Sequence, residues 1–208
     1  DSVWVRLTQT FGLGGEGKVV DGFTGATPLG QIAAAKDILP DIHNTLGGPL
    51  NNWDAFLGFL PGSVGEVSTL AILIGAFILI FTGIASYKIM VSGVVGVVAM
   101  ASLFNAIGAT PAMEVTALQH ILYGGFAFGI VFMATDPVTA ARTETGKWIY
   151  GFLIGVMVVF IRVLNAGYAE GMMLAILLMN TFAPLIDYIV VERNVSKRQA
   201  RLVAKSKN

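Results

Sequence analysis

The sequence has no cysteine and few charged residues. None of its 208 residues is Cys, and only 12% are Asp, Glu, Lys or Arg, against roughly 25% in soluble domains. Without cysteine the chain can form no disulfide, thiolate zinc site or cysteine-bound iron–sulfur cluster. Its formal net charge of zero gives no overall field to attract nucleic acid. We therefore expect no nucleic-acid partner, and any redox centre must be organic or come from another subunit.

Long apolar segments dominate the chain instead. Hydrophobic residues make up 55% of it, and a membrane span needs about 20 of them in succession. Five segments qualify as candidates: Val67–Tyr87, Ile89–Ala106, His120–Thr135, Trp148–Leu164 and Met172–Val191. The third and fourth are short, so we expect flanking residues to extend them or a broken helix packed inside protein. The predicted fold is an all-α integral membrane bundle of five helices (67–191), preceded by an outer segment (1–66) and followed by a basic tail (192–208).

Lysine and arginine predict the orientation of this bundle. The tail holds Arg193, Lys197, Arg198, Arg201, Lys205 and Lys207. If this tail is cytoplasmic, the connection with Lys88 and the connection with Arg142 and Lys147 are cytoplasmic too. The loops on the other side, 108–119 and 165–171, contain no Lys or Arg, so every loop agrees with the positive-inside rule. With an odd number of spans, residues 1–66 fall on the outer side of the membrane, which is the periplasmic side for a bacterial inner membrane. We expect the tail to be an anchor at the anionic inner leaflet.

Two glycine-rich stretches lie in the outer segment. Gly12 to Lys18 nearly fits nucleotide-binding patterns, but no strand precedes it and Val19 stands where Ser or Thr would bind magnesium. The second stretch, Asp21-Gly22-Phe23-Thr24-Gly25-Ala26-Thr27, allows two interpretations. Small residues could expose the Thr27 hydroxyl to a modifying enzyme or a cofactor phosphate, or Thr27 could cap a helix that begins at Pro28. Residue chemistry alone favours the cap.

Longer strings of residues carry a resemblance to a known family. Residues 21–27 resemble the motif in which a flavin transferase joins FMN to the last threonine through a phosphoester. Residues 59–66, 134–138, 170–177 and 182–187 resemble the C-terminal half of the B subunit in sodium-translocating NADH:quinone reductases. The resemblance covers essentially the whole chain, although the family commonly has Ser where this chain has Thr24.

This resemblance implies a flavoprotein with covalent FMN on Thr27, in an attachment motif that includes Asp21, Thr24, Gly25 and Ala26. Electrons would pass from NADH through other subunits and this flavin towards ubiquinone, coupled to Na⁺ transport. The five helices would form half of a ten-helix repeat fold. Because the chain begins with Asp and has no signal sequence at its start, we expect a fragment of a longer protein. A second, noncovalent flavin (riboflavin) and the quinone site would involve mostly its N-terminal half.

Ionisable residues near the membrane segments are further candidates. For Asp187 we weigh a ligand on the Na⁺ pathway against an interfacial carboxylate paired with the basic tail. For Glu66 a first-turn carboxylate competes with a role close to the flavin. Arg162 could extend to the membrane surface or pair with the FMN phosphate.

Other residues are predicted to be structural. Asp136, followed by Pro137, is typical of a helix cap, and we favour this over an ion-binding role. His43 and His120 have no neighbour at metal-ligand spacing. Gly151 and Gly155 are spaced for close helix contact, as are Gly125 and Gly129, although glycine is also common in membrane helices.

Two alternatives to the quinone reductase stay open. The corresponding subunit of the Rnf ferredoxin:NAD oxidoreductase shares the flavinylated threonine, but the Leu46–Leu60 connection and the Phe182–Asp187 stretch favour the quinone reductase. A channel or transporter built from a five-helix repeat would also have glycine-rich, broken spans. Bound flavin would distinguish the transporter from the two redox subunits.

Overall fold

The computed structural model describes residues 27–34, 50–60, 62–63 and 65–206, which form helices and loops with no strand among them. The attachment-motif residues Asp21, Thr24, Gly25 and Ala26 lie outside these ranges. The shorter helices at one end of the bundle are α2 (Pro28–Ala34), α3 (Asn52–Leu57), η1 (Pro111–Met113) and η3 (Ala166–Tyr168).

Among the residues that the structure describes, three helices are long and apolar enough to cross a membrane. They are α5 (Tyr87–Ile107), α8 (Glu144–Leu164) and α9 (Met172–Ser206). They confirm the second, fourth and fifth predicted spans as continuous helices. The fourth, which is short in the sequence pattern, reaches 21 residues because it begins at Glu144, after the Thr143 cap.

The first and third predicted spans differ from continuous membrane-length helices. Helix α4 (Thr69–Phe81) has 13 residues, or about 20 Å of helix. The third region is broken into α6 (Ala117–Leu122), α7 (Phe126–Phe128) and a π-helical turn, η2 (Gly129–Met133). The break occurs at Gly124, whose φ is +70°. A broken third segment was one of the two predicted outcomes, while the total of five spans stays a prediction.

Close packing of α5 against α8 forms the centre of the bundle. A Cβ atom added to Gly96 would lie 3.1 Å from the Cα of Gly155, and one added to Gly155 would lie 2.8 Å from the backbone nitrogen of Val97. The predicted helix contact at Gly155 is therefore confirmed. Tyr150 and Ile154 of α8 are fully buried beside this contact.

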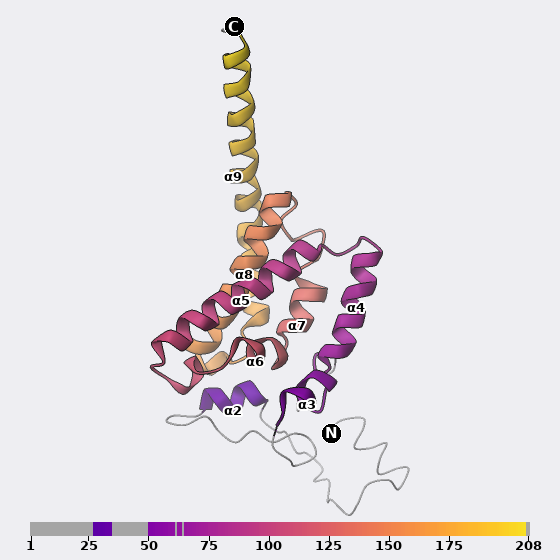
Figure 1. Cartoon of the computed structure of the whole chain (residues 1–208), viewed down its shortest axis with the longest axis vertical. Coiled ribbons are helices and arrows are strands. Elements are labelled where there is room, and N and C mark those ends of the chain that lie inside the picture. Colours follow the sequence, from indigo (N-terminus) through magenta and orange to yellow (C-terminus); the bar gives the residue numbers. More distant parts are fainter. Residues whose placement is uncertain (1–26, 35–49, 61, 64, 207–208) are drawn as a thin grey trace, which may run out of the picture.

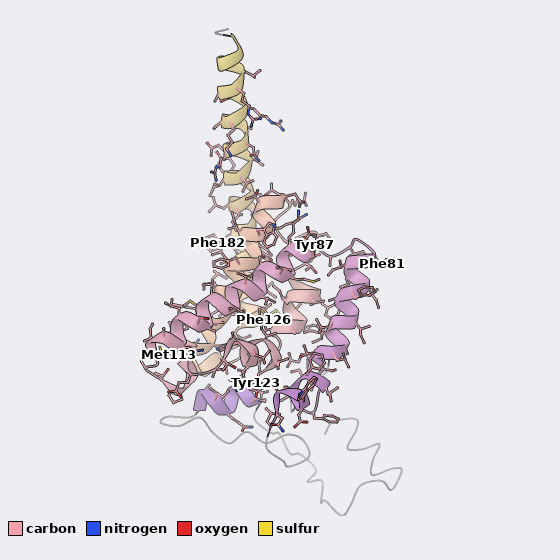
Figure 2. The ribbon with its side chains drawn as sticks, in the orientation of Figure 1. Phe81, Tyr87, Met113, Tyr123, Phe126 and Phe182 are labelled. Atoms are coloured by element: carbon pink, nitrogen blue, oxygen red, sulfur yellow. The ribbon has the colours of Figure 1, made fainter. Side chains whose placement is uncertain are left out.

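The two ends of the bundle carry different elements (Figure 1). Helices α2 and α3 cover one end, and α9 projects from the opposite end. The elements at the covered end share a separate small hydrophobic core. It consists of Leu29, Ile32, Ala55, Leu60, Val115, Leu122 and Tyr123. In Figure 2 Tyr123 lies beside α2, whereas Tyr87 and Phe81 lie towards the opposite end. The described part of the outer segment thus packs on the bundle, as expected of a segment too short for its own core.

Candidate functional site

Thr27 is the N-cap of helix α2. Its carbonyl oxygen accepts a hydrogen bond from the Gln31 N–H at 2.9 Å, and its Oγ1 accepts one from the Gly30 N–H at 3.2 Å. Pro28 follows as the first helical residue and is buried, which suits a position where no N–H is needed. The predicted helix cap is therefore confirmed, and the half-buried hydroxyl group stays near the surface.

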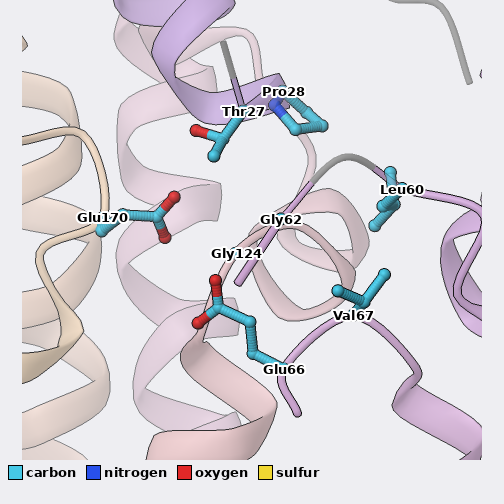
Figure 3. Close-up of a pocket in the computed structure, with 8 residues that line it drawn as sticks. All are labelled: Thr27, Pro28, Leu60, Gly62, Glu66, Val67, Gly124 and Glu170. Carbon is cyan, nitrogen blue, oxygen red and sulfur yellow. The ribbon is translucent and has the colours of Figure 1, made fainter. Parts of the chain in front are cut away.

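A small pocket opens beside Thr27. It is lined by Thr27, Pro28, Leu60, Gly62, Glu66, Val67, Gly124 and Glu170. Figure 3 shows the carboxyl groups of Glu66 and Glu170 and the Thr27 hydroxyl directed towards the same space. The room inside is about 10 Å³, which suffices for about one water molecule. The pocket therefore brings two of the predicted site residues, Thr27 and Glu66, together.

Glu66 lies on the loop that leads into α4. Its Oε1 accepts a hydrogen bond from the Ser63 N–H at 3.1 Å. The first-turn interpretation is wrong, because Ser68 caps the helix and Thr69 is its first residue. Glu66 instead turns its carboxylate back onto its own loop and towards Gly125, where an added Cβ atom would lie 2.6 Å from Oε2.

Glu170 is a site residue that the sequence patterns did not predict. Its Oε2 accepts a hydrogen bond from the Gly125 N–H at 3.3 Å, while its Oε1 is buried without a hydrogen-bond partner among the described residues. Gly124 permits this approach. Its φ of +70° favours glycine, and an added Cβ atom would collide with the Glu170 carboxylate and lie 2.6 Å from Leu29 Cδ1. The available signal was that Glu170 is the only charged residue in the loop 165–171.

Arg162 is buried at the same end of the bundle, with 4% of its surface exposed. Its Nε donates to the Glu170 carbonyl at 3.0 Å and its Nη1 to the His120 carbonyl at 2.5 Å, while Nη2 has no partner among the described residues. The opposite charges of Glu170 and Glu66 act on its guanidinium. Extension to the membrane surface is therefore wrong, because α6 and the loop before α9 cover this end of α8.

Asp187 lies far from Thr27, towards the end from which α9 projects. Its Oδ2 accepts from the Arg142 N–H at 2.7 Å, and its Oδ1 accepts from the Thr143 N–H at 3.0 Å and the Thr143 hydroxyl at 2.6 Å. Pairing with the basic tail is wrong for the described residues, where the ion pairs join Glu144 to Lys88 and Lys147. The carboxylate instead ties α9 to the start of α8.

The remaining polar candidates have structural contacts. Asp136 accepts hydrogen bonds from the Thr139 hydroxyl at 2.8 Å and the Thr139 N–H at 3.1 Å, so it closes a turn rather than capping a helix. The Thr139 hydroxyl holds the pKa of Asp136 below its usual range. His120 is buried, and its Nδ1 has no partner in the described part of the chain. Within the described ranges no group of three or more His, Asp or Glu side chains is placed to hold a metal ion.

Comparisons with known proteins identify the family of this chain. The family model described as the NQR2, RnfD, RnfE family matches residues 2–196. The chain is 54% identical over 184 residues to the B subunit of the Na(+)-translocating NADH-quinone reductase of Yersinia pestis and to that of Pseudomonas paraeruginosa, and 52% identical over 183 residues to that of Haemophilus influenzae. These matches cover 87% or 88% of this chain but only 44% of each relative. The chain is thus a membrane protein that belongs to the NQR2, RnfD, RnfE family.

Proposed function

We propose that this chain is the flavin-bearing part of the B subunit in a sodium-translocating NADH–quinone reductase, with FMN joined to Thr27 by a phosphoester. The observation that carries the proposal is the state of the Thr27 hydroxyl. It is half-buried beside a small pocket that two carboxylates and several apolar residues line, and its oxygen accepts the Gly30 N–H while its own proton has no acceptor among the described residues. The names of the relatives support the same function.

The Thr27 position fits a phosphoester. Esterification replaces the hydroxyl hydrogen, whereas the cap of α2 uses an oxygen lone pair. The bond to Gly30 can therefore persist in the modified protein. Because the adjoining pocket has room for about one water molecule, a flavin ring on Thr27 has to lie outside it, where a flavin transferase can also reach the threonine.

The neighbouring residues have distinct roles in this proposal. Bound FMN supplies electron transfer, and the protein sets its position and electrostatic surroundings. Buried Leu29 and Ile32 fix α2, and with it Thr27, on the bundle. The negative charges of the Glu66 and Glu170 carboxylates make the pocket unfavourable for the FMN phosphate, which therefore points away from it. Arg162 balances part of this negative charge from its buried position.

Asp187 is our candidate for the Na⁺ pathway, and carboxylate oxygens are suitable ligands for hard cations. A carboxylate offers about four lone-pair sites, and the structure occupies three of them, two on Oδ1 and one on Oδ2. One site on Oδ2 is therefore available to an ion. This role would be additional to the connection between α9 and α8.

The proposed orientation places Thr27 on the periplasmic side and the C-terminus in the cytoplasm. The ion pairs of Lys88 and Lys147 with Glu144 support it, because they gather the loop charges at the end from which α9 projects, opposite Thr27. The proposal also includes ubiquinone, the other subunits and the flavin transferase. A riboflavin site would lie mostly within the N-terminal half of the longer protein. The Rnf alternative shares the Thr27 chemistry, but the three relatives are all named as quinone reductase subunits.

In-gel flavin fluorescence of the denatured protein tests this function. Wild type and two variants, Thr27→Ala and Thr27→Ser, are expressed in cells that contain the flavin transferase. We expect a fluorescent band for the wild type, retention of the band in Thr27→Ser because the hydroxyl group is kept, and its loss in Thr27→Ala. A dark wild-type band from cells with active transferase would overturn the flavoprotein assignment and favour the transporter alternative.

A further inference from the structure

The C-terminal part of α9, from residue 192 onward, continues past the bundle as a single helix. The helix runs without interruption from Met172 to Ser206, and Figure 1 shows it projecting straight from the end opposite α2. Every residue from 192 to 202 is exposed. The segment thus has a surface that nothing in the described part of the chain covers.

The basic residues of this segment lie on one face. Arg193, Lys197 and Arg201 follow one another at four-residue spacing, and Arg198 is next to them on the helix surface. All four are exposed, and none forms an ion pair with another described residue. Glu192 is the only acidic residue in this segment. The face therefore has an uncompensated positive charge.

An apolar ridge borders the basic face. It consists of Val191, Val195 and Leu202, at spacings of four and seven residues that return to one side of a helix. Their exposed fractions are 50%, 47% and 68%. Exposed apolar side chains that continue past the end of a bundle in this way are typical of a protein-binding helix.

Distance along the helix distinguishes two possible partners of the basic face, lipid headgroups and another protein. Asp187, bonded to the Arg142–Thr143 loop, marks the polar boundary of the bundle. With a rise of 1.5 Å per residue, Arg193 lies roughly 9 Å beyond it and Arg201 about 21 Å beyond it. The headgroup layer is about 5–7 Å deep, and charges in physiological salt are screened beyond about 8 Å. Arg193 can therefore reach lipid headgroups, whereas Arg201 lies beyond their range.

We infer that the face formed by Lys197, Arg198, Arg201 and Leu202 docks an acidic protein surface, belonging to another subunit of the complex, on the cytoplasmic side. This inference rests on the proposed function for the existence of such subunits. In this inference only the first turn of the tail contacts the membrane, and the rest of the tail binds protein instead of serving as the expected membrane anchor. The partner surface has Asp or Glu side chains for the basic face and an apolar pocket for Leu202.

Site-specific photo-crosslinking in the intact complex tests the contact. A photoreactive amino acid replaces Leu202, and a matched control replaces Ala200, which is exposed and, two residues earlier, lies on nearly the opposite side of the same helix. We expect Leu202 to give a protein adduct whose partner peptide contains Asp or Glu residues, with several-fold lower yield from Ala200. Lipid adducts, no adduct, or equal yields at the two positions would overturn the inference.

Charge reversal provides the second test. We expect the combined variant Lys197→Glu, Arg198→Glu, Arg201→Glu to reduce the Leu202 adduct several-fold, and Arg193→Glu to leave it nearly unchanged. An adduct that persists in the combined variant would contradict the inference. Fluorescence of the Thr27 band, read in the same gels, is independent of the tail, so a missing flavin and a missing contact are distinguished.

Discussion

The two ends of the bundle handle polar groups in opposite ways. At the Thr27 end, Arg162 and Glu170 are turned inward, and each has a buried polar atom without a partner among the described residues. At the end from which α9 projects, Asp187 and Glu144 have their oxygens engaged by loop N–H groups, a hydroxyl or lysines. Unsatisfied buried polar groups are costly. The Thr27 end therefore has the features of a functional site, whereas the contacts at the other end are those of a structural joint, to which the proposed Na⁺ role of Asp187 would be additional.

The largest effect is expected at Arg162. Arg162→Met removes the donors to the buried carbonyls of His120 and Glu170, and each unpaired group costs about 1–3 kcal/mol. We therefore expect a loss of about 2–6 kcal/mol in stability, together with lower flavin occupancy because Glu170 shifts beside Thr27. Thermal unfolding of the detergent-solubilised protein measures the first, and in-gel flavin fluorescence the second.

Arg162→Lys is the matched control for that variant. A lysine keeps the positive charge but cannot bond both carbonyls through one planar fork, so an intermediate loss is expected. If Arg162→Met kept wild-type stability and flavin occupancy, the buried arginine would stabilise neither the fold nor the Thr27 site. That result would contradict the interpretation of the Thr27 end as a functional site.

A moderate effect is expected where Asp187 meets Thr143. Asp187→Ala and Thr143→Val each remove the hydrogen bond between the carboxylate and the hydroxyl, so their effects should not add. A double-mutant cycle on the free energy of unfolding should give a coupling of about 1 kcal/mol. Strict additivity would show that this hydrogen bond contributes no stability to the joint between α9 and α8.

The smallest effect is expected at Asp136. The Thr139 hydroxyl lowers its pKa, so its stabilisation of the turn is present above the unfolded pKa of about 4 and is lost as the pH falls through the lower folded pKa. Hydrogen exchange of residues 136–141, corrected for intrinsic rates, should therefore accelerate at low pH. Asp136→Asn should abolish this pH dependence, and an unchanged dependence in the variant would assign it to another group.

Sequence patterns predicted the parts of the fold that depend on local composition. The long apolar runs predicted α5, α8 and α9, small residues predicted the contact at Gly155, and Thr27-Pro28 predicted the cap of α2. Hydropathy could not predict that α4 has 13 residues, because the apolar run continues past Phe81 while the helix ends there.

The site was harder to predict because it is assembled from distant segments. Glu170 reaches the pocket only because Gly124, 46 positions earlier, leaves room for it. Arg162 lies at the outer end of an apolar helix, a position typical of extension to the membrane surface. The segments that bury it become its neighbours only in the folded chain. Both cases depend on tertiary contacts rather than on local sequence.

The most direct test of the central claim is a mass measurement on the peptide that contains Thr27. The protein, isolated from cells with active flavin transferase, is digested, and the modified residue is located by fragmentation. We expect the peptide to carry one FMN through a phosphoester on Thr27 and on no other residue. An unmodified Thr27 peptide, or FMN on Thr24, would contradict the assignment of Thr27 as the attachment site.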